Sequence, residues 1–222
     1  MSCTGCGYGL HESARTLAPG HFGGGGAVTV VANAAGDVGK THVRNVGLDL
    51  GMMRVGVARH VDVGFGVAYL AGGRADLKVS LLREDFPLAL AVRVGVGGAA
   101  TPIALAFAYA GVLASVDATS WLQPYLGCTF ADHWIFGLDQ GSAPSGTAVA
   151  GRAGYGDGVL QNVLGFRFFL EEGNRPVSLS LEYGLWFPLQ DDPGDGFSFV
   201  VNHLASLGVC IGCPQRSAAP KR

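Results

Sequence analysis

The sequence predicts an all-β protein, a transmembrane antiparallel up-and-down β-barrel of about ten strands. Three observations support this fold class. Only 14% of the 222 residues are charged, 49% are hydrophobic and 36 are glycine, which is too apolar for a typical soluble domain. Bulky apolar side chains alternate with small or charged ones over many short segments. Short polar connections alternate along the chain with longer ones.

The clearest alternation of side chains lies in residues 86–98. One face of that segment carries Leu88, Leu90, Val92, Val94 and Val96. The opposite face carries Ala89, Ala91, Arg93, Gly95 and Gly97. Residues 61–70 and 176–187 repeat the pattern. In a further segment, four alanines alternate with Ile103, Leu105, Phe107 and Tyr109. We expect the bulky faces to contact lipid and the small or charged faces to line a narrow, crowded lumen.

Ten segments follow this period of two. Their spans are 22–35, 42–58, 61–71, 74–82, 86–98, 102–116, 120–136, 159–170, 176–188 and 197–211. The second segment loses its phase near Met52 and Met53, which predicts a β-bulge. The seventh is the least regular, because Pro124 and Asp132 fall on its apolar register.

Transmembrane helices are the alternative, since only helices and closed barrels satisfy every backbone polar group in lipid. The most apolar stretch, residues 94–116, is long enough to span a bilayer but contains Gly97, Gly98 and Pro102. Elsewhere polar residues interrupt each apolar run before the ~20 residues that a spanning helix needs. We therefore reject helices in favour of the barrel.

The connections between the segments differ in length on the two sides of the barrel. The second, fourth, sixth and eighth are short and polar, with the sequences "RHVD", "REDF", "DATS" and "EEGNRP". The others include "LQDDPGDG" and the long "GLDQGSAPSGTAVAGRAGYGDG". Short turns on one side and long loops on the other are typical of outer-membrane barrels. We expect short periplasmic turns, longer extracellular loops and, with an even strand number, both chain ends on the periplasmic side.

By this architecture, and not by a specific motif, residues 20–211 resemble the small bacterial outer-membrane β-barrel proteins. The resemblance implies a location in the bacterial outer membrane, with its lipid and the barrel-insertion machinery as partners. One departure is the final strand, which continues into the polar tail "PQRSAAPKR" and not into a terminal aromatic residue. We divide the chain into a periplasmic N-terminal lead-in (1–21), the β-barrel (22–213) and a polar C-terminal tail (214–222).

Charged side chains on the small faces are expected to point into the lumen. They are Asp49, Arg54, Asp62, Asp76, Lys78, Arg93, Arg167 and Glu182. Arg167 and Glu182 lie on adjacent segments, so we predict that they pair. The functional interpretation is a selectivity constriction or a proton path. We favour a structural ion-pair network that fills the interior, because a buried charge needs a partner.

Four of the five cysteines form two Cys-x-x-Cys pairs, Cys3 with Cys6 and Cys210 with Cys213. Such pairs can bind a metal through four thiolates, and "CTGCGYG" resembles the first knuckle of rubredoxin. The oxidising periplasm instead favours disulfides. "CTGC" also resembles the end of a lipoprotein signal, with Cys6 or Cys3 as the lipid acceptor. We predict lipidation or disulfides, with no metal and no cofactor.

Residues 1–20 contain no apolar h-region of a secretory signal. We therefore expect the signal to lie upstream of this sequence, with Met1 an artificial or misassigned start. Catalytic signals are also few: Asp132 and His133 are adjacent on a strand and point to opposite faces. The acidic "DDPGD" at 191–195 is interpreted as a solvated turn. We predict no catalytic residues and no enzymatic activity.

The predicted function is a structural, anchoring or narrow-pore role in the outer membrane. Two alternatives remain open, a surface-facing enzyme acting on lipid or peptide and a soluble carrier of the lipocalin type. The carrier requires the bulky face inside the barrel. Nucleic acid is not an expected partner, because a net charge of -2 gives no basic surface for it.

Overall fold

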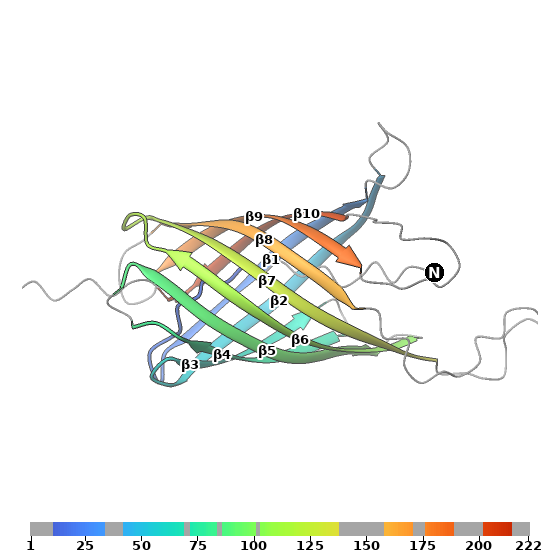
Figure 1. Ribbon diagram of the computed structural model, residues 1–222, viewed down its shortest axis with the longest axis horizontal. Helices are drawn as coiled ribbons and strands as arrows, with labels where there is room; N and C mark the ends of the chain where they lie inside the picture. Colours follow the sequence, from blue (N-terminus) through green and yellow to red (C-terminus); the bar gives the residue numbers. More distant parts are fainter. Residues whose placement is uncertain are drawn as a thin grey trace, which may run out of the picture.

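The computed structural model describes residues 11–33, 42–68, 72–83, 86–100, 103–137, 158–170, 176–188 and 202–214. Its ten strands pair antiparallel in chain order, and β1 pairs with β10 to close the barrel (Figure 1). The strands are β1 (Phe22–Asn33), β2 (His42–Ala58), β3 (Val61–Ala68), β4 (Gly72–Ser80), β5 (Leu88–Ala100), β6 (Ile103–Val116), β7 (Leu122–Gly137), β8 (Val159–Phe169), β9 (Val177–Pro188) and β10 (Asn202–Ile211). Each predicted segment overlaps one strand, so the predicted fold class is confirmed.

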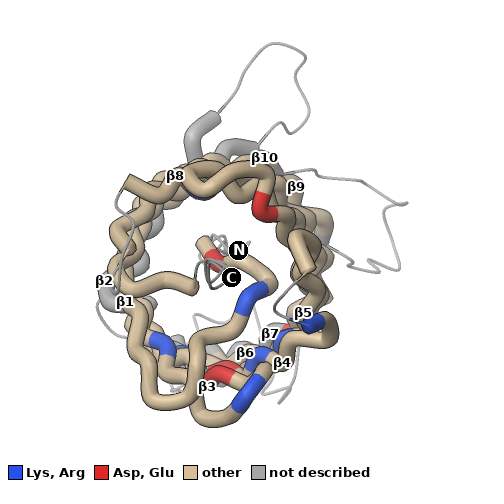
Figure 2. The backbone as a smooth tube through the Cα atoms, turned by 90° about the vertical axis from the view of Figure 1, so that its left-hand side faces the viewer, with Lys and Arg blue, Asp and Glu red and all other residues tan. Residues whose placement is uncertain are grey.

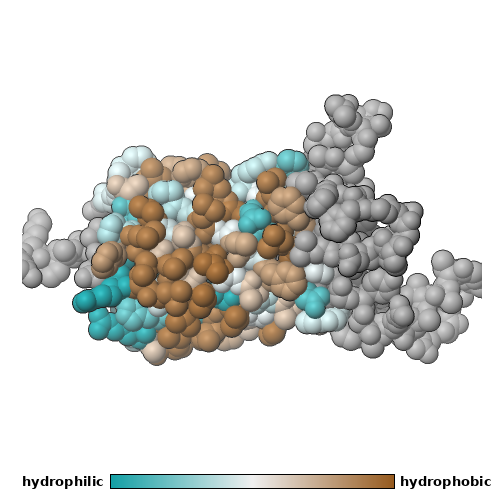
Figure 3. Space-filling view, in the orientation of Figure 1, coloured by the Kyte–Doolittle hydropathy of each residue, from teal (hydrophilic) through white to brown (hydrophobic). Residues whose placement is uncertain are grey.

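The barrel wall has an apolar exterior and a polar interior, as the period-two pattern predicts. On β5, Val94 is 51% exposed on the outer face, whereas Arg93 beside it is 4% exposed. Strands β3 and β9 alternate in the same way, with Phe65 and Leu181 exposed and Asp62 and Glu182 buried. Apolar side chains cover the middle of the visible face, and hydrophilic residues gather towards the ends (Figure 3).

Strand β6 reverses the orientation that its sequence predicts. Phe107 and Tyr109 are buried and point into the barrel, while the alternating Ala110 is exposed on the outer face. The reason is the neighbouring strand, where Gly97 lies opposite Phe107 and Gly95 lies opposite Tyr109. Each aromatic ring occupies the space that a glycine leaves open, so the expectation that these rings contact lipid was wrong.

The β-bulge expected near Met52 and Met53 is present. The pairing of β2 with β3 shifts its register between Leu50 and Met52, and the pairing of β1 with β2 shifts between Gly25 and Ala27. In the described part of the chain, no helix has the length and apolar character to cross a membrane.

Strands β2, β4, β6 and β8 end, and β3, β5, β7 and β9 begin, at one end of the barrel, which we call the short-turn end. β1 begins and β10 ends at this end, where Gly24 pairs with Ile211. The strand ends therefore lie on the side that the even strand number predicts.

Candidate functional site in the barrel lumen

Residues 11–17, which we call the lumen segment, lie inside the barrel (Figure 2). His11, Ser13 and Ala14 are at most 4% exposed. The chain then reaches the short-turn end, where Gly20 adopts a φ of 77° and turns into β1. The amide N–H of Gly20 donates a 2.8 Å hydrogen bond to the carbonyl of Gly56, which ties this turn to the wall.

The location of the lumen segment corrects one prediction. Residues 1–21 were expected to be a periplasmic lead-in to the barrel, but the described part of them up to residue 17 is buried within it. The physical reason is the inner face of the wall, where small side chains leave room for the lumen segment. At Gly208, a Cβ atom would lie 2.8 Å from Ser180 Oγ and would also overlap the His11 ring.

His11 is bound by three neighbouring strands. Its Nδ1 lies 2.8 Å from Ser180 Oγ on β9, and its Nε2 lies 2.5 Å from Ser206 Oγ on β10. Its backbone N–H donates to a carboxylate oxygen of Glu182, and its carbonyl accepts a 2.5 Å hydrogen bond from Arg167 on β8. Both ring nitrogens and both backbone groups of His11 are therefore satisfied by the wall.

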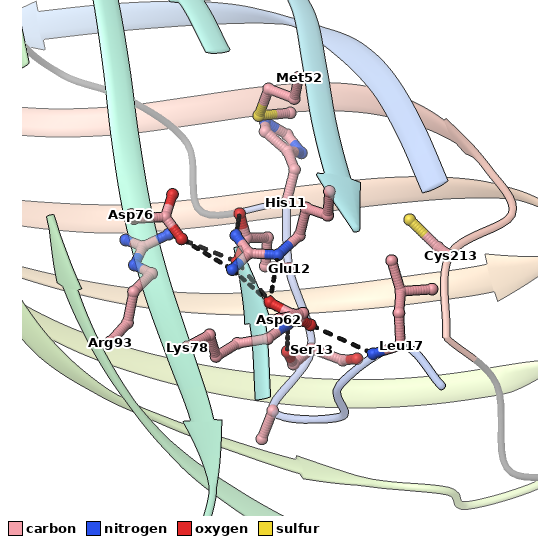
Figure 4. Close-up of polar contacts among 12 residues, drawn as sticks. His11, Glu12, Ser13, Leu17, Met52, Asp62, Asp76, Lys78, Arg93 and Cys213 are labelled. Atoms are coloured by element: carbon pink, nitrogen blue, oxygen red, sulfur yellow. Dashed lines mark hydrogen bonds and ion pairs between the residues drawn. The ribbon is translucent and has the colours of Figure 1, made fainter. Parts of the chain in front are cut away.

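Arg54 on β2 is the centre of an ion-pair cluster that joins β2, β3 and β4 to the lumen segment. Figure 4 labels its partners Glu12, Asp62 and Asp76. Its guanidinium lies 2.7 Å from Glu12, 2.5 Å from Asp62 and 2.7 Å from Asp76. Asp62 also lies 3.4 Å from Lys78 Nζ. These side chains are at most 9% exposed, so each charge depends on its neighbours for compensation.

Glu12 connects the lumen segment to this cluster. Besides Arg54, its carboxylate lies 3.6 Å from Arg93 Nη1 and 3.9 Å from Lys78 Nζ. Arg93 lies with its guanidinium carbon 5.0 Å from the centre of the Tyr109 ring. One carboxylate of the segment thus faces three cations from β2, β4 and β5.

Residues 14–17 of the lumen segment contact the wall near the short-turn end. The amide N–H of Ala14 donates a 3.2 Å hydrogen bond to Ser115 Oγ, and that of Leu17 donates a 3.2 Å hydrogen bond to Asp62. Arg15 pairs with Asp117 and donates a 2.7 Å hydrogen bond to the carbonyl of Phe86. Ala14 also packs in an apolar cluster with Ala89, Ala91, Leu113 and Val163.

Seven of the eight predicted lumen residues have buried side chains. They are Arg54, Asp62, Asp76, Lys78, Arg93, Arg167 and Glu182. Asp49 lies on β2 opposite Ala27 and Ala68, and its side chain is outside the described residues. Arg167 and Glu182 meet through the backbone of His11, so their direct pairing stays a prediction.

Sequence reasoning missed several residues of this site. Arg74 is buried on β4 and shares the register of Asp76 and Lys78, a signal that was present in the alternation. The lumen segment gave a weaker signal, namely charged residues just before the first strand.

The cysteines are divided by the structure. Cys210 and Cys213 form a disulfide at the short-turn end. Cys3 and Cys6, together with the predicted lipid acceptor, lie outside the described residues. Cys128 on β7 is free and exposed on the outer face. Within the described ranges, no three His, Cys, Asp or Glu side chains are grouped as metal ligands.

The lumen changes the pKa values of two groups that the segment inserts, His11 and Glu12. Burial, and then the charge of Arg167 and Arg74, lowers the pKa of His11 to about 3, although Glu182 lies 3.6 Å away. Burial alone would raise the pKa of Glu12, but the surrounding cations outweigh it and hold that pKa below its ordinary value. The segment therefore inserts a neutral imidazole and a charged carboxylate at neutral pH.

Acid is expected to loosen the lumen segment. We call the state in which residues 11–17 have left the lumen the withdrawn state. The pKa of His11 is 6.5 in the withdrawn state and about 3 in the inserted state. Between these pH values the withdrawn state therefore binds more protons. Lowering the pH from 7.5 to 5 then weakens insertion by roughly 2 kcal/mol, about 30-fold. Glu12 acts in the same direction below its ordinary pKa of 4.5. Hydrogen exchange of residues 11–17, corrected for intrinsic rates, measures this change.

The matched control is His11→Gln, which keeps hydrogen-bonding groups but cannot titrate. Its exchange protection is expected to stay nearly constant between pH 7.5 and 5. Equal pH dependence in the variant and the unchanged chain would contradict the assignment to His11.

The chain is similar, at low sequence identity, to several solved structures. Neisserial surface protein A is 12% identical, with a TM-score of 0.41, over 86% of this chain and 96% of that one. Ail, the attachment invasion locus protein of Yersinia pestis, is 15% identical, with a TM-score of 0.32, over 87% and 98%. The outer membrane protein OprG from Pseudomonas aeruginosa is 13% identical, with a TM-score of 0.31, over 90% and 97%.

No protein-family model matches the sequence, and no curated protein matches it. The fold consequently rests on the barrel itself, with its closed strand order, its apolar exterior and its charged lumen. The chain has the fold of a transmembrane antiparallel β-barrel, the architecture expected of a bacterial outer-membrane protein.

Proposed function

We propose that this chain is a bacterial outer-membrane β-barrel with a structural or anchoring role, whose lumen is closed by its own N-terminal segment. The observation that carries the proposal is the burial of the lumen segment among paired charges. Glu12 and Arg15 of the segment each pair with charged wall residues. Among the described residues, the wall and the segment together fill the part of the interior around residues 11–17.

The exterior of the barrel supports a membrane location. Its outward side chains include Phe65, Val96, Leu126, Leu181, Tyr183 and Leu207, all more than 50% exposed. In water such a surface would far exceed the apolar patches that soluble monomers tolerate. It also argues against a soluble carrier, which needs these side chains inside. Outer-membrane lipid is the partner that such an exterior fits, and the barrel-insertion machinery remains a partner predicted from the resemblance.

The close packing around the lumen segment supports a closed barrel in preference to an open pore. A cavity bordered by His11, Glu12 and Arg54 has a volume of about 30 Å³, room for no more than about two water molecules. The charged groups beside it are committed to one another as ion pairs. This supports a non-enzymatic role, because groups used for neutralisation are not free to act on a substrate.

Thiol labelling at Cys128 tests the membrane location. This cysteine lies on the outer face of β7, between the exposed Leu126 and Phe130. In lipid vesicles, with Cys3 and Cys6 changed to serine, we expect an apolar maleimide to label Cys128 and a charged, water-soluble maleimide to leave it unlabelled.

The control is Arg59→Cys, at an exposed position in the β2–β3 turn. In permeabilised vesicles it should react with both reagents. Rapid labelling of Cys128 by the charged maleimide in intact and permeabilised vesicles would refute the membrane location.

A further inference from the structure

The lumen wall carries an excess of positive charge. Its described buried side chains include the cations Arg54, Arg74, Lys78, Arg93 and Arg167. The described buried carboxylates of the wall are Asp62, Asp76 and Glu182. Five positive charges less three negative ones leave two positive charges. Emptied of the lumen segment, this part of the wall would attract anions.

Glu12 supplies negative charge from outside the wall. Its carboxylate is within 4 Å of Arg54, Lys78 and Arg93. For Arg93, it is the only carboxylate within ion-pair distance among the described residues, at 3.6 Å. Arg93 Nε and Nη1 nevertheless donate no hydrogen bond within this part of the chain, although the side chain is 4% exposed. The Glu12 carboxylate therefore leaves hydrogen-bond donors of these cations, on Arg93, available for another acceptor.

Glu12 belongs to a segment and not to a strand. After Leu17 the chain leaves the lumen, and among the described residues its covalent connection to the wall is at Phe22, where β1 begins. Its other ties to the wall are hydrogen bonds, ion pairs and packing. The segment can therefore leave the lumen without breaking a strand pair.

We propose that Arg54, Lys78 and Arg93 form an anion site in the lumen, which the Glu12 carboxylate occupies as a built-in ligand. Withdrawal of the lumen segment opens an anion-selective channel through this site. The ligand class is small anions, chloride and small oxyanions such as phosphate or a carboxylate, because guanidinium and ammonium groups bind them through charge-assisted hydrogen bonds. This inference rests on the proposed closed outer-membrane barrel.

The variant Glu12→Lys tests the inference in the full chain. It places a fourth cation among three, so repulsion should drive the segment out. In planar bilayers under a potassium chloride gradient, the unchanged chain should be silent. Glu12→Lys should conduct, with a reversal potential on the chloride side. Adding Arg93→Gln to it should lower the chloride-to-potassium permeability ratio several-fold, because a cation of the site is removed.

Asp132→Lys is the matched control, since it makes the same change of charge on the apolar register of β7, away from the lumen. It should remain silent. Circular dichroism and flotation with liposomes confirm for each variant that the barrel folds and inserts. A folded, inserted Glu12→Lys barrel that stays silent, or that prefers potassium, would overturn the inference.

These results separate the inference from the proposed function. Steady conductance of the unchanged chain, or its failure to float with liposomes, contradicts the closed outer-membrane barrel itself. A silent, inserted unchanged chain together with a silent Glu12→Lys leaves the closed barrel intact and rejects only the anion site.

Discussion

Replacing Arg54 with glutamine is expected to lower the free energy of unfolding by roughly 3–5 kcal/mol. The Arg54 guanidinium lies 2.5 to 2.7 Å from the carboxylates of Glu12, Asp62 and Asp76. Glutamine removes the charge and leaves three buried carboxylates to share Lys78 and Arg93. The loss is large because a buried charge without a partner cannot regain its hydration. Urea unfolding in detergent micelles, followed by tryptophan fluorescence, measures it.

Arg59→Gln is the matched control, because Arg59 is exposed in the β2–β3 turn. A surface substitution of this kind should change stability by no more than about 0.5 kcal/mol. Arg54→Lys should fall between the two, since an ammonium keeps the charge but lacks the planar fork that reaches three carboxylates. Equal stabilities of Arg54→Gln and Arg59→Gln would show that the ion-pair cluster contributes nothing to the fold.

The strand positions could be predicted from the sequence because each depends on local alternation. The orientation of β6 could not, because it depends on pairs between strands. Phe107 and Tyr109 read as lipid-facing by size, yet Gly97 and Gly95 on β5 provide the space that draws both rings inward. The Tyr109 hydroxyl then donates a 3.1 Å hydrogen bond to Asp76, which a lipid-facing tyrosine could not do.

The wall charges could be predicted in the same way, since alternation places Asp76 and Lys78 on one face of β4. The lumen segment has no such periodic signal. Its contacts join residues far apart in the chain, such as His11 with Ser206 and Ala14 with Ser115. The free inner space that the segment fills is a property of the closed barrel, and it becomes apparent only when ten strands are placed around one axis.

Gly56→Ala is expected to release the lumen segment while leaving the barrel wall paired. A Cβ atom at position 56 would lie 2.6 Å from the carbonyl oxygen of Leu17 and would overlap the carbonyl of Ala18. Both obstacles are backbone atoms, which cannot rotate away, so the segment must shift at its exit from the lumen. Overpacking of this kind costs about 1–3 kcal/mol. If that cost falls on insertion, the withdrawn population rises roughly 5- to 150-fold.

Tryptic cleavage after Arg15 reports this population, because the Arg15 side chain is 6% exposed and pairs with Asp117 in the inserted state. Cleavage follows the withdrawn fraction when withdrawal is faster than proteolysis. Mass spectrometry of the released peptide distinguishes this bond from tryptic sites in the loops.

Gly73→Ala is the matched control for this experiment, because a Cβ atom there would meet only the carbonyl oxygen of Gly66, at 3.7 Å. Its cleavage rate should equal that of the unchanged chain. Faster cleavage in Gly56→Ala with unchanged resistance of the wall to urea means that segment and wall separate as independent units. If protection from trypsin after Arg15 and resistance of the wall to urea are both lost in Gly56→Ala, the segment is part of the barrel core. Opening the lumen then requires unfolding of the wall.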